Sequence, residues 1–239
     1  MKTIPLFKVH MPESVKEPLL ETLFSGFVGQ GPKVDEFESR LSDYFNNTNT
    51  LTVNAGTSAL HLALRLANVA PGDEVIATPM TCTASNMPIL AMGAKIVWAD
   101  VDPVSGLISV ESIKSKITKK TKAILMVHFG GIPCDIDEIN ELAKKHGIKT
   151  IEDAAHSFGS EYRDQKIGNH SDFVMFSFQA IKHITTIDGG LLICKSDADY
   201  RRGRLLRWFG IDRDSPRTDF RCEENIAEWG YKFHMNDIS

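Results

Sequence analysis

The 239-residue sequence lacks the features that mark secreted, membrane and nucleic-acid-binding proteins. Its start holds no continuous apolar run, because Pro5, Pro12 and Pro18 interrupt it, so we expect neither a signal peptide nor a membrane span. The 27 basic residues are outnumbered by 31 acidic ones and form no block that would follow a phosphate backbone. We therefore expect a cytoplasmic protein with no membrane and no nucleic acid among its partners.

Cysteine is scarce, and CxxC pairs are absent. Widely spaced cysteines fit buried thiols in a reducing compartment better than a disulfide or zinc framework. No second histidine or carboxylate stands at ligand spacing beside Asp153 and His156, so we expect no metal. The four cysteines are Cys82, Cys134, Cys194 and Cys222.

The sequence does contain an alternation of short β-branched runs with longer amphipathic stretches. With 42% hydrophobic residues, the chain can bury a sizeable core. The alternation is typical of βαβ units on a mostly parallel sheet and predicts an α/β fold. We expect seven strands, at Thr50–Val53, Glu74–Thr78, Lys95–Ala99, Ala123–His128, Lys149–Glu152, Phe173–Phe176 and Gly190–Cys194. Helical patterns lie between or after them at Ser58–Ala67, Ala84–Met92, Val110–Ile117, Ile136–His146 and Ala198–Phe209.

The last part of the chain allows three further expectations. The connection from Phe176 to Gly190 is too short for a crossover helix, so we expect the final strand to run antiparallel. The polar stretch Asp212–Asp219 is the one candidate boundary, and the tail behind it is too short for a second domain. The arginines of the segment Tyr200–Arg207 are expected on a solvated helix face rather than against the diphosphate of a nucleotide.

The first segment with chemical meaning is Val53–Leu60, of sequence VNAGTSAL. Here a strand ends, a glycine permits a tight turn, and small hydroxyl residues begin a helix. Exposed N–H groups at a helix N-terminus, with the hydroxyls of Thr57 and Ser58, form a phosphate site. The alternative is an ordinary helix cap by serine or threonine. The segment contains neither a Walker loop nor a GxGxxG motif.

The second segment is Ile151–His156, where acidic residues and a histidine follow an apolar strand. In an open α/β sheet the carboxyl ends of the strands form the ligand crevice, so these side chains would face a site. Asp153 could there hold a cation, a metal or a protonated ring nitrogen. The alternatives are a helix cap for Asp153 and a core histidine for His156.

The third segment is Phe176–Gly190, of sequence FSFQAIKHITTIDGG. Lys182 stands between Ile181 and Ile184, and burial there would favour the neutral amine that Schiff-base chemistry needs. Ser177, five residues earlier, can reach a phosphate. Taken without the other two segments, Lys182 fits a surface loop better.

Together the segments GTSAL, EDAAHS and FSFQAIK, with the terminal GYKFHMND, resemble the DegT/DnrJ/EryC1/StrS family of pyridoxal-phosphate (PLP) enzymes. The resemblance runs from Phe27 nearly to the last residue. It implies the aspartate-aminotransferase fold, a mainly parallel seven-stranded sheet with helices on both faces. It also implies a PLP-binding large domain over residues 1–239, with an N-terminal arm over about residues 1–30.

The resemblance assigns roles to particular residues. Lys182 becomes the Schiff-base lysine, Asp153 the partner of the pyridine nitrogen, and His156 a contact near the phenolic oxygen of the ring. Asn236 matches an asparagine that reaches the phosphate of the neighbouring subunit, which implies a homodimer. The positions implied to contact the cofactor are Gly56, Thr57, Ser58, Cys82, Asp153, His156, Ser177, Lys182 and Asn236.

The implied reaction moves an amino group from an amino acid, glutamate by family habit, to a nucleotide-linked keto sugar. Such sugars serve surface polysaccharide or deoxyaminosugar synthesis. A related branch of the family has histidine in place of the lysine and dehydrates the sugar instead. Because Lys182 occupies the lysine position and His183 follows it, we favour transamination over dehydration.

The sequence departs from the family pattern in three places. Cys82 stands where many relatives have an aromatic residue that stacks on the ring. Ile187 stands where glycine is usual, and a β-branched side chain resists a positive φ. The chain also stops at Ser239, whereas relatives continue through a smaller C-terminal domain. A non-catalytic or partner-dependent PLP-binding fragment is therefore the alternative to an active aminotransferase.

Overall fold

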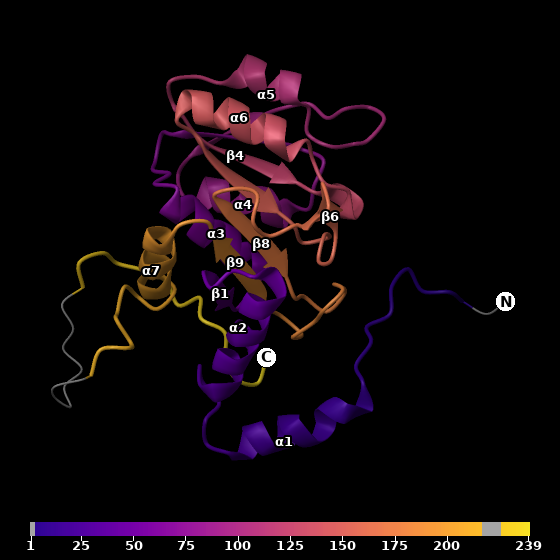
Figure 1. The fold of residues 1–239 in the computed structure, drawn as a ribbon, viewed down its shortest axis with the longest axis vertical. Coiled ribbons are helices and arrows are strands. Elements are labelled where there is room, and N and C mark those ends of the chain that lie inside the picture. The colour runs from indigo at the N-terminus through magenta and orange to yellow at the C-terminus, as the bar shows by residue number, and fades with distance from the viewer. Residues whose placement is uncertain (1–2, 217–225) are drawn as a thin grey trace.

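A computed structural model describes residues 3–216 and 226–239, and its centre is a sheet of seven strands in the order β1-β9-β8-β5-β4-β2-β3 (Figure 1). Only β9 runs antiparallel to its neighbours, β1 and β8, so both the mainly parallel sheet and the antiparallel final strand are confirmed. The strands are β1 (Thr50–Val53), β2 (Glu74–Ala77), β3 (Lys95–Trp98), β4 (Thr121–Val127), β5 (Lys149–Asp153), β8 (Phe173–Ser177) and β9 (Gly190–Cys194).

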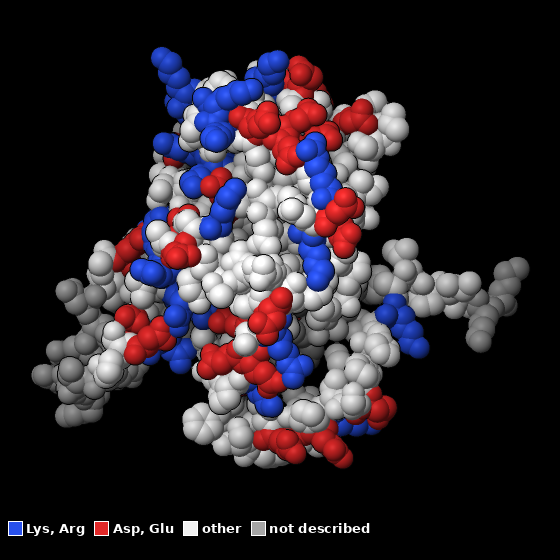
Figure 2. All heavy atoms as spheres, viewed as in Figure 1, with Lys and Arg blue, Asp and Glu red and all other residues white. Residues whose placement is uncertain are grey.

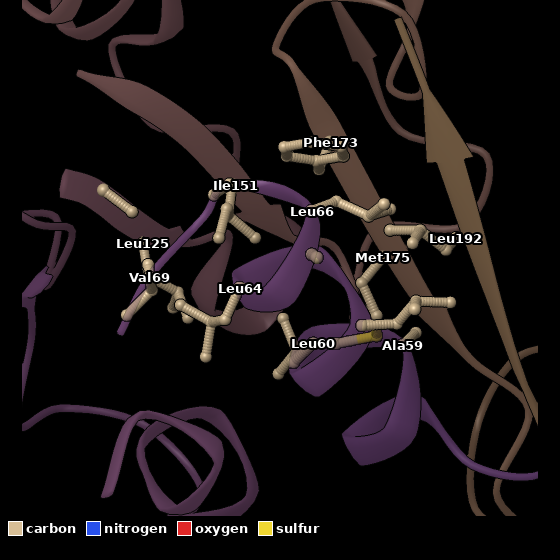
Figure 3. Close-up of a cluster of buried hydrophobic side chains, with 14 of the residues drawn as sticks. Ala59, Leu60, Leu64, Leu66, Val69, Leu125, Ile151, Phe173, Met175 and Leu192 are labelled. Carbon is tan, nitrogen blue, oxygen red and sulfur yellow. The ribbon is translucent and has the colours of Figure 1, made fainter. Parts of the chain in front are cut away.

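Helices cover both faces of the sheet, as predicted. One face carries α3 (Gly56–Leu66), α4 (Thr83–Ala91) and α7 (Asp197–Leu206), and Figure 3 shows α3 packed on the strands through Leu60, Leu64 and Leu66. The other face carries α2 (Pro32–Phe45), α5 (Val110–Lys116) and α6 (Ile136–His146). Neighbouring strand residues such as Ile124 and Leu125 point to opposite cores because side chains alternate along a strand.

The expected elements are all present, with ends that differ by up to three residues. Elements without a sequence-based expectation are α2, α1 (Lys16–Phe24), the short 3-10 turns Glu13–Val15 and Phe129–Gly131, and the hairpin of β6 (Glu161–Tyr162) and β7 (Gln165–Lys166). The expected arm over residues 1–30 thus includes a helix, α1, which lies apart from the sheet in Figure 1.

The C-terminal tail returns to the body of the fold. The carboxylate of Asp237 accepts hydrogen bonds from the backbone N–H groups of Gly31, Lys33 and Val34, at 2.8, 3.1 and 3.1 Å. These are the exposed donors at the start of α2, whose N-cap residue Gly31 has no side chain to satisfy them. The tail behind the candidate boundary at Asp212–Asp219 thus contacts the start of α2, and residues 217–219 of that stretch lie outside the described part of the chain.

A second contact joins α2 to α7 through a buried arginine. Arg207 is 3% exposed and pairs with Glu38, and it also donates to the carbonyl oxygen of Thr52 at 2.9 Å. The expectation of a solvated arginine face is therefore wrong for Arg207. Arg204 is half-buried and paired with Asp214, because the helix packs this side against α2 and the following loop.

The cysteine expectation is correct for Cys134 and Cys194, which are free and buried. Burial raises the pKa of Cys134 to about 12. The expectation is wrong for Cys82, which is exposed because it precedes α4 at the mouth of a pocket. Cys222 lies outside the described residues.

Two surface properties bear on possible partners. Within the described residues, no helix is both long and apolar enough to cross a membrane, and the cytoplasmic location stays a prediction. Figure 2 shows acidic and basic side chains interspersed on the face in view.

The Asp237 contact predicts a stability effect far from the helix in sequence. Replacing Asp237 with alanine should lower the free energy of unfolding by about 1 to 2 kcal/mol, because three N–H groups at the start of α2 lose their acceptor. Urea denaturation measures this. The control Asp43→Ala removes an exposed acid from the same helix and should change stability by less than about 0.5 kcal/mol. Equal effects of the two substitutions would show that the Asp237 cap contributes nothing.

Candidate functional site

A pocket of 320 Å³ opens where the parallel strands end. It lies at the carboxyl edge of the sheet, beyond the ends of β4, β5 and β8, and between the N-termini of α3 and α4. Ligands bind at this edge in open α/β sheets because the loops there converge. Among the predicted site residues, the lining contains Gly56, Thr57, Cys82, Asp153, His156, Ser177 and Lys182.

The N-terminus of α3 forms one wall of the pocket. Its N-cap residue is Ala55, and no side chain caps the helix, so the alternative of a serine or threonine cap is not realised. A side chain at Gly56 would lie 3.0 Å from the Cβ of Ser177, which brings the helix start against the end of β8. The hydroxyl of Ser58 donates to the side-chain oxygen of Asn54 at 2.7 Å, and Ser58 does not line the pocket.

Asp153 lies at the floor of the pocket, at the last position of β5, and is 4% exposed. Its Oδ1 accepts the N–H of Ala155 at 3.1 Å, and its Oδ2 accepts the hydroxyl of Ser85 at 2.6 Å. Asp153 is not a helix cap, because the next residues form a turn rather than a helix. The buried carboxylate is thus held by two donors and remains accessible from the pocket.

His156 follows three residues later and is half-buried. Its Nδ1 accepts the N–H of Gly130 at 3.3 Å, which leaves the proton of the neutral ring on Nε2. Burial lowers the pKa of His156, and Lys182 and His183 lower it further, while Asp153 opposes them. His156 is therefore neutral near pH 7 and able to donate from Nε2.

Lys182 lines the pocket from the loop between β8 and β9, and it is half-buried. The expectation that Ile181 and Ile184 bury it is wrong, since these side chains are 47% and 38% exposed. The N–H of Lys182 donates to the carbonyl oxygen of Gln179 at 2.9 Å, and this bond closes a turn in the loop. The amine reaches the pocket because of this turn and not because of apolar neighbours in sequence.

The remaining predicted positions lie at the edge of the pocket or away from it. Cys82 lines the mouth but is exposed. Asn236 is not part of the lining, and its side-chain oxygen accepts the N–H groups of Ile238 and Ser239 at 2.9 and 3.1 Å. Its implied role on a neighbouring subunit stays a prediction.

The structure adds residues that the sequence did not single out. Ser85 lies in the first turn of α4 and contacts Asp153, and Thr81 contacts Ser85. Gln179 also lines the pocket, from the loop that carries Lys182. The sequence around Ser85 does not indicate a site residue, because its partner Asp153 lies on a strand 68 residues away in sequence.

Comparisons with known proteins agree with this geometry. The family model described as "DegT/DnrJ/EryC1/StrS aminotransferase family" matches residues 10–239. Among solved structures, the sugar aminotransferase CalS13 from Micromonospora echinospora is 38% identical with a TM-score of 0.93, covering 99% of this chain and 65% of CalS13. Spr1654 from Streptococcus pneumoniae, solved in PLP and PMP forms, is 34% identical with a TM-score of 0.90, over 99% of this chain and 64% of Spr1654.

A curated relative, the uncharacterized protein MJ1066 from Methanocaldococcus jannaschii, is 37% identical over 238 residues, which are 98% of this chain and 62% of MJ1066. The chain thus spans less than two thirds of the length of these relatives. The expected resemblance and fold are confirmed by the comparisons.

The comparisons confirm the cofactor prediction, because the family match includes a protein solved in PLP and PMP forms. Three groups that such a molecule needs converge on one cavity: the amine of Lys182, the carboxylate of Asp153 and the uncapped start of α3. A helix N-terminus binds phosphate, a carboxylate binds a protonated ring nitrogen, and a primary amine reacts with an aldehyde.

The loop that carries Lys182 contains a strained residue, and this generates a prediction. Ile187 has φ of +71° and is 60% exposed, so its conformation costs about 1 to 2 kcal/mol with little burial in return. Replacing Ile187 with glycine should raise the free energy of unfolding by about 1 kcal/mol in urea denaturation. The control Ile184→Gly, at a residue without positive φ, should lower it. Destabilisation by both substitutions would show that Ile187 is not strained.

Proposed function

The chain belongs to the DegT/DnrJ/EryC1/StrS aminotransferase family, and we propose that it transfers an amino group from an amino acid, glutamate, to a nucleotide-linked keto sugar with PLP. The observation that carries the proposal is the convergence of Lys182, Asp153 and the α3 N-terminus on one pocket. This transfer would serve polysaccharide or aminosugar synthesis. The structural likeness to CalS13, a sugar aminotransferase, also supports the proposal.

When bound, PLP supplies an electron-withdrawing ring that accepts the electrons released as a Cα proton leaves. Asp153 would place its carboxylate beside the ring nitrogen, where its negative charge would favour a proton on that nitrogen. The N–H groups of Gly56 and Thr57, with the hydroxyls of Thr57 and Ser177, would hold the phosphate. His156 would donate from Nε2 to the phenolic oxygen of the ring, since its Nδ1 is already an acceptor.

Lys182 would hold the cofactor through its amine and would also act as the general base that moves the proton at Cα of the amino donor. Its half-buried position suits both tasks, because the amine is accessible and borders the pocket. A hollow of 350 Å³ adjoins this amine and is lined by Gly130, His156, Ile181, Lys182 and His183. We propose that the sugar approaches from this hollow. The presence of Lys182 in the pocket favours transamination over dehydration.

The proposal predicts one site of covalent attachment. After incubation with PLP and reduction with borohydride, peptide mapping should find the adduct on Lys182, because among the described residues it is the one lysine that lines the pocket with Asp153 and the start of α3. Lys182→Ala should lose the adduct and lower transamination by a factor of at least about 10³. The matched control Lys166→Ala removes an exposed lysine and should retain both. Reduction products on Lys166 in place of Lys182 would refute the assignment.

We also propose that two copies assemble as a homodimer, with Asn236 of one copy near the phosphate of the other. The supporting observation is the apolar surface of the N-terminal segment, where Ile4, Leu6 and Phe24 are 90%, 97% and 82% exposed. Large apolar side chains at this density favour a protein partner over water. A second copy is the partner that the family resemblance implies.

The dimer can be tested by sedimentation over a range of protein concentrations. The wild-type chain should sediment with twice the mass of a single chain. Phe24→Ser should raise the dimer dissociation constant at least about tenfold, because each interface loses apolar contact area. Val104→Ser, at a side chain that is 93% exposed elsewhere, is the control and should have no effect. A wild-type monomer at all concentrations would exclude the proposed assembly.

A further inference from the structure

The hollow beside the Lys182 amine continues the cofactor pocket, because His156, Ile181 and Lys182 line both cavities. His183 lines the hollow and not the pocket. A small molecule that presents one group to Lys182 can therefore place a second group beside His183. The roles proposed above for Lys182 and His156 do not involve His183.

The turn that carries His183 is held by hydrogen bonds on both sides of this residue. Before it, the N–H of Ile181 donates to the side-chain oxygen of Gln179 at 3.0 Å. After it, the N–H of Thr186 donates to the carbonyl oxygen of Phe178 at 3.0 Å. The ring of His183 itself is exposed, so its N–H group is available to a ligand. The backbone thus presents this donor to the hollow before any ligand arrives.

The polar side chains around the hollow all carry nitrogen: they are two imidazole rings and one amine. No carboxylate is among the described residues that line it. Burial lowers the pKa of His156, and Lys182 and His183 lower it further, so both lie within electrostatic reach of its ring. Asp153 acts in the opposite direction, but it lines the pocket and not the hollow. The hollow therefore offers N–H donors to an anionic group.

The proposed substrates contain two kinds of anionic group, the carboxylate of the amino donor and the diphosphate of the nucleotide-linked sugar. In an amino acid the α-carboxylate is bonded to the carbon that carries the amine, and the side-chain carboxylate of glutamate is only a few bonds away. In the nucleotide-linked sugar the sugar ring separates the diphosphate from the reacting carbon. A hollow that begins at the reactive lysine is therefore better placed for a carboxylate.

We propose that His183 is a binding residue for the amino donor, and that its ring donates a hydrogen bond to a carboxylate of that amino acid in the hollow. The inference rests on the proposed function in taking an amino acid as the donor. This bond would fix the orientation of the donor while Lys182 moves the Cα proton. The keto sugar would enter the same hollow after the deaminated donor has left.

The first test needs no cofactor. The PLP-free chain is titrated with glutarate, a dicarboxylate without an amine, while the imidazole signals are followed by NMR. Glutarate should shift the signals of His183 until they saturate. It should leave the signals of His146, an exposed histidine at the end of α6, unchanged.

Two substitutions separate the N–H group of His183 from its bulk. His183→Phe keeps a ring without a donor and should weaken glutarate binding at least about fivefold, because one hydrogen bond to a charged oxygen is lost. His183→Gln keeps an N–H donor and should bind glutarate within about twofold of wild type. The control His146→Phe should have no effect. Equal glutarate affinities of wild type and His183→Phe, or no glutarate binding by wild type, would overturn the proposal.

Inorganic pyrophosphate is the second probe and represents the diphosphate of a sugar nucleotide. Its affinity should change by less than about twofold in His183→Phe. If the substitution weakens pyrophosphate and leaves glutarate unchanged, the hollow binds the diphosphate and the proposal is wrong. An equal loss for the two probes would show a general anion site, which would also overturn the assignment to a carboxylate.

The second test follows the cofactor absorbance of the PLP-loaded chain in single-turnover reactions with an amino donor. His183→Phe should raise the half-saturating glutamate concentration at least about fivefold and lower the maximal rate by less than that factor, because a binding contact is lost while Lys182 remains. The same increase with alanine would assign the α-carboxylate to His183. An increase with glutamate alone would assign the side-chain carboxylate.

The outcomes separate the inference from the proposed function. If the wild-type chain with PLP does not react with glutamate, the proposed function fails, and the glutarate titration still decides whether His183 binds a carboxylate. If wild type reacts and His183→Phe has the same half-saturating concentrations for glutamate and alanine, the inference is overturned while the proposed function stands.

Discussion

The buried pairing of Arg207 with Glu38 is the contact on which the geometry at one side of the sheet depends. Glu38 also accepts from the N–H and the hydroxyl of Thr52, at 2.8 and 2.7 Å, so one carboxylate holds both α7 and β1. Such a pair is costly to desolvate and therefore demands all of its hydrogen bonds. Because β1 leads directly into α3, fixing β1 also fixes the helix N-terminus that faces the pocket.

A second constraint comes from the alternation of side chains at the end of β5. Asp153 faces the pocket, while the preceding Glu152 faces the opposite core and contacts the Nε2 of His128 at 2.9 Å, with both side chains fully buried. The Nδ1 of His128 accepts the N–H of Cys134, which closes the loop that carries Gly130. Gly130 in turn holds the ring of His156. The two adjacent acidic residues thus act on different parts of the site. Asp153 lies in the pocket itself, and Glu152 holds the loop whose Gly130 contacts His156.

Much of the fold could be predicted because it depends on local patterns. The β-branched runs gave all seven central strands, and the short link before Gly190 gave the direction of β9. Helix α2 could have been predicted, since Val34, Leu41 and Phe45 lie on one buried face. Its cap could not, because Asp237 lies 206 residues from Gly31 in the sequence. Helix α1 in the arm and the exposure of Cys82 were not predicted, because both depend on tertiary contacts.

The site was predictable to the extent that its residues follow strand ends in sequence. Asp153, His156 and Ser177 do so, and the topology alone brings them to one edge of the sheet. Ser85 and Thr81 do not, since they belong to a different βα unit and meet Asp153 only when β2 and β5 lie on either side of β4. Lys182 shows the converse case: its neighbours in sequence suggested burial, yet its exposure is set by a turn. Sequence patterns identify the pocket residues that follow strand ends, whereas the hydroxyl groups that contact Asp153 are brought there by the order of strands in the sheet.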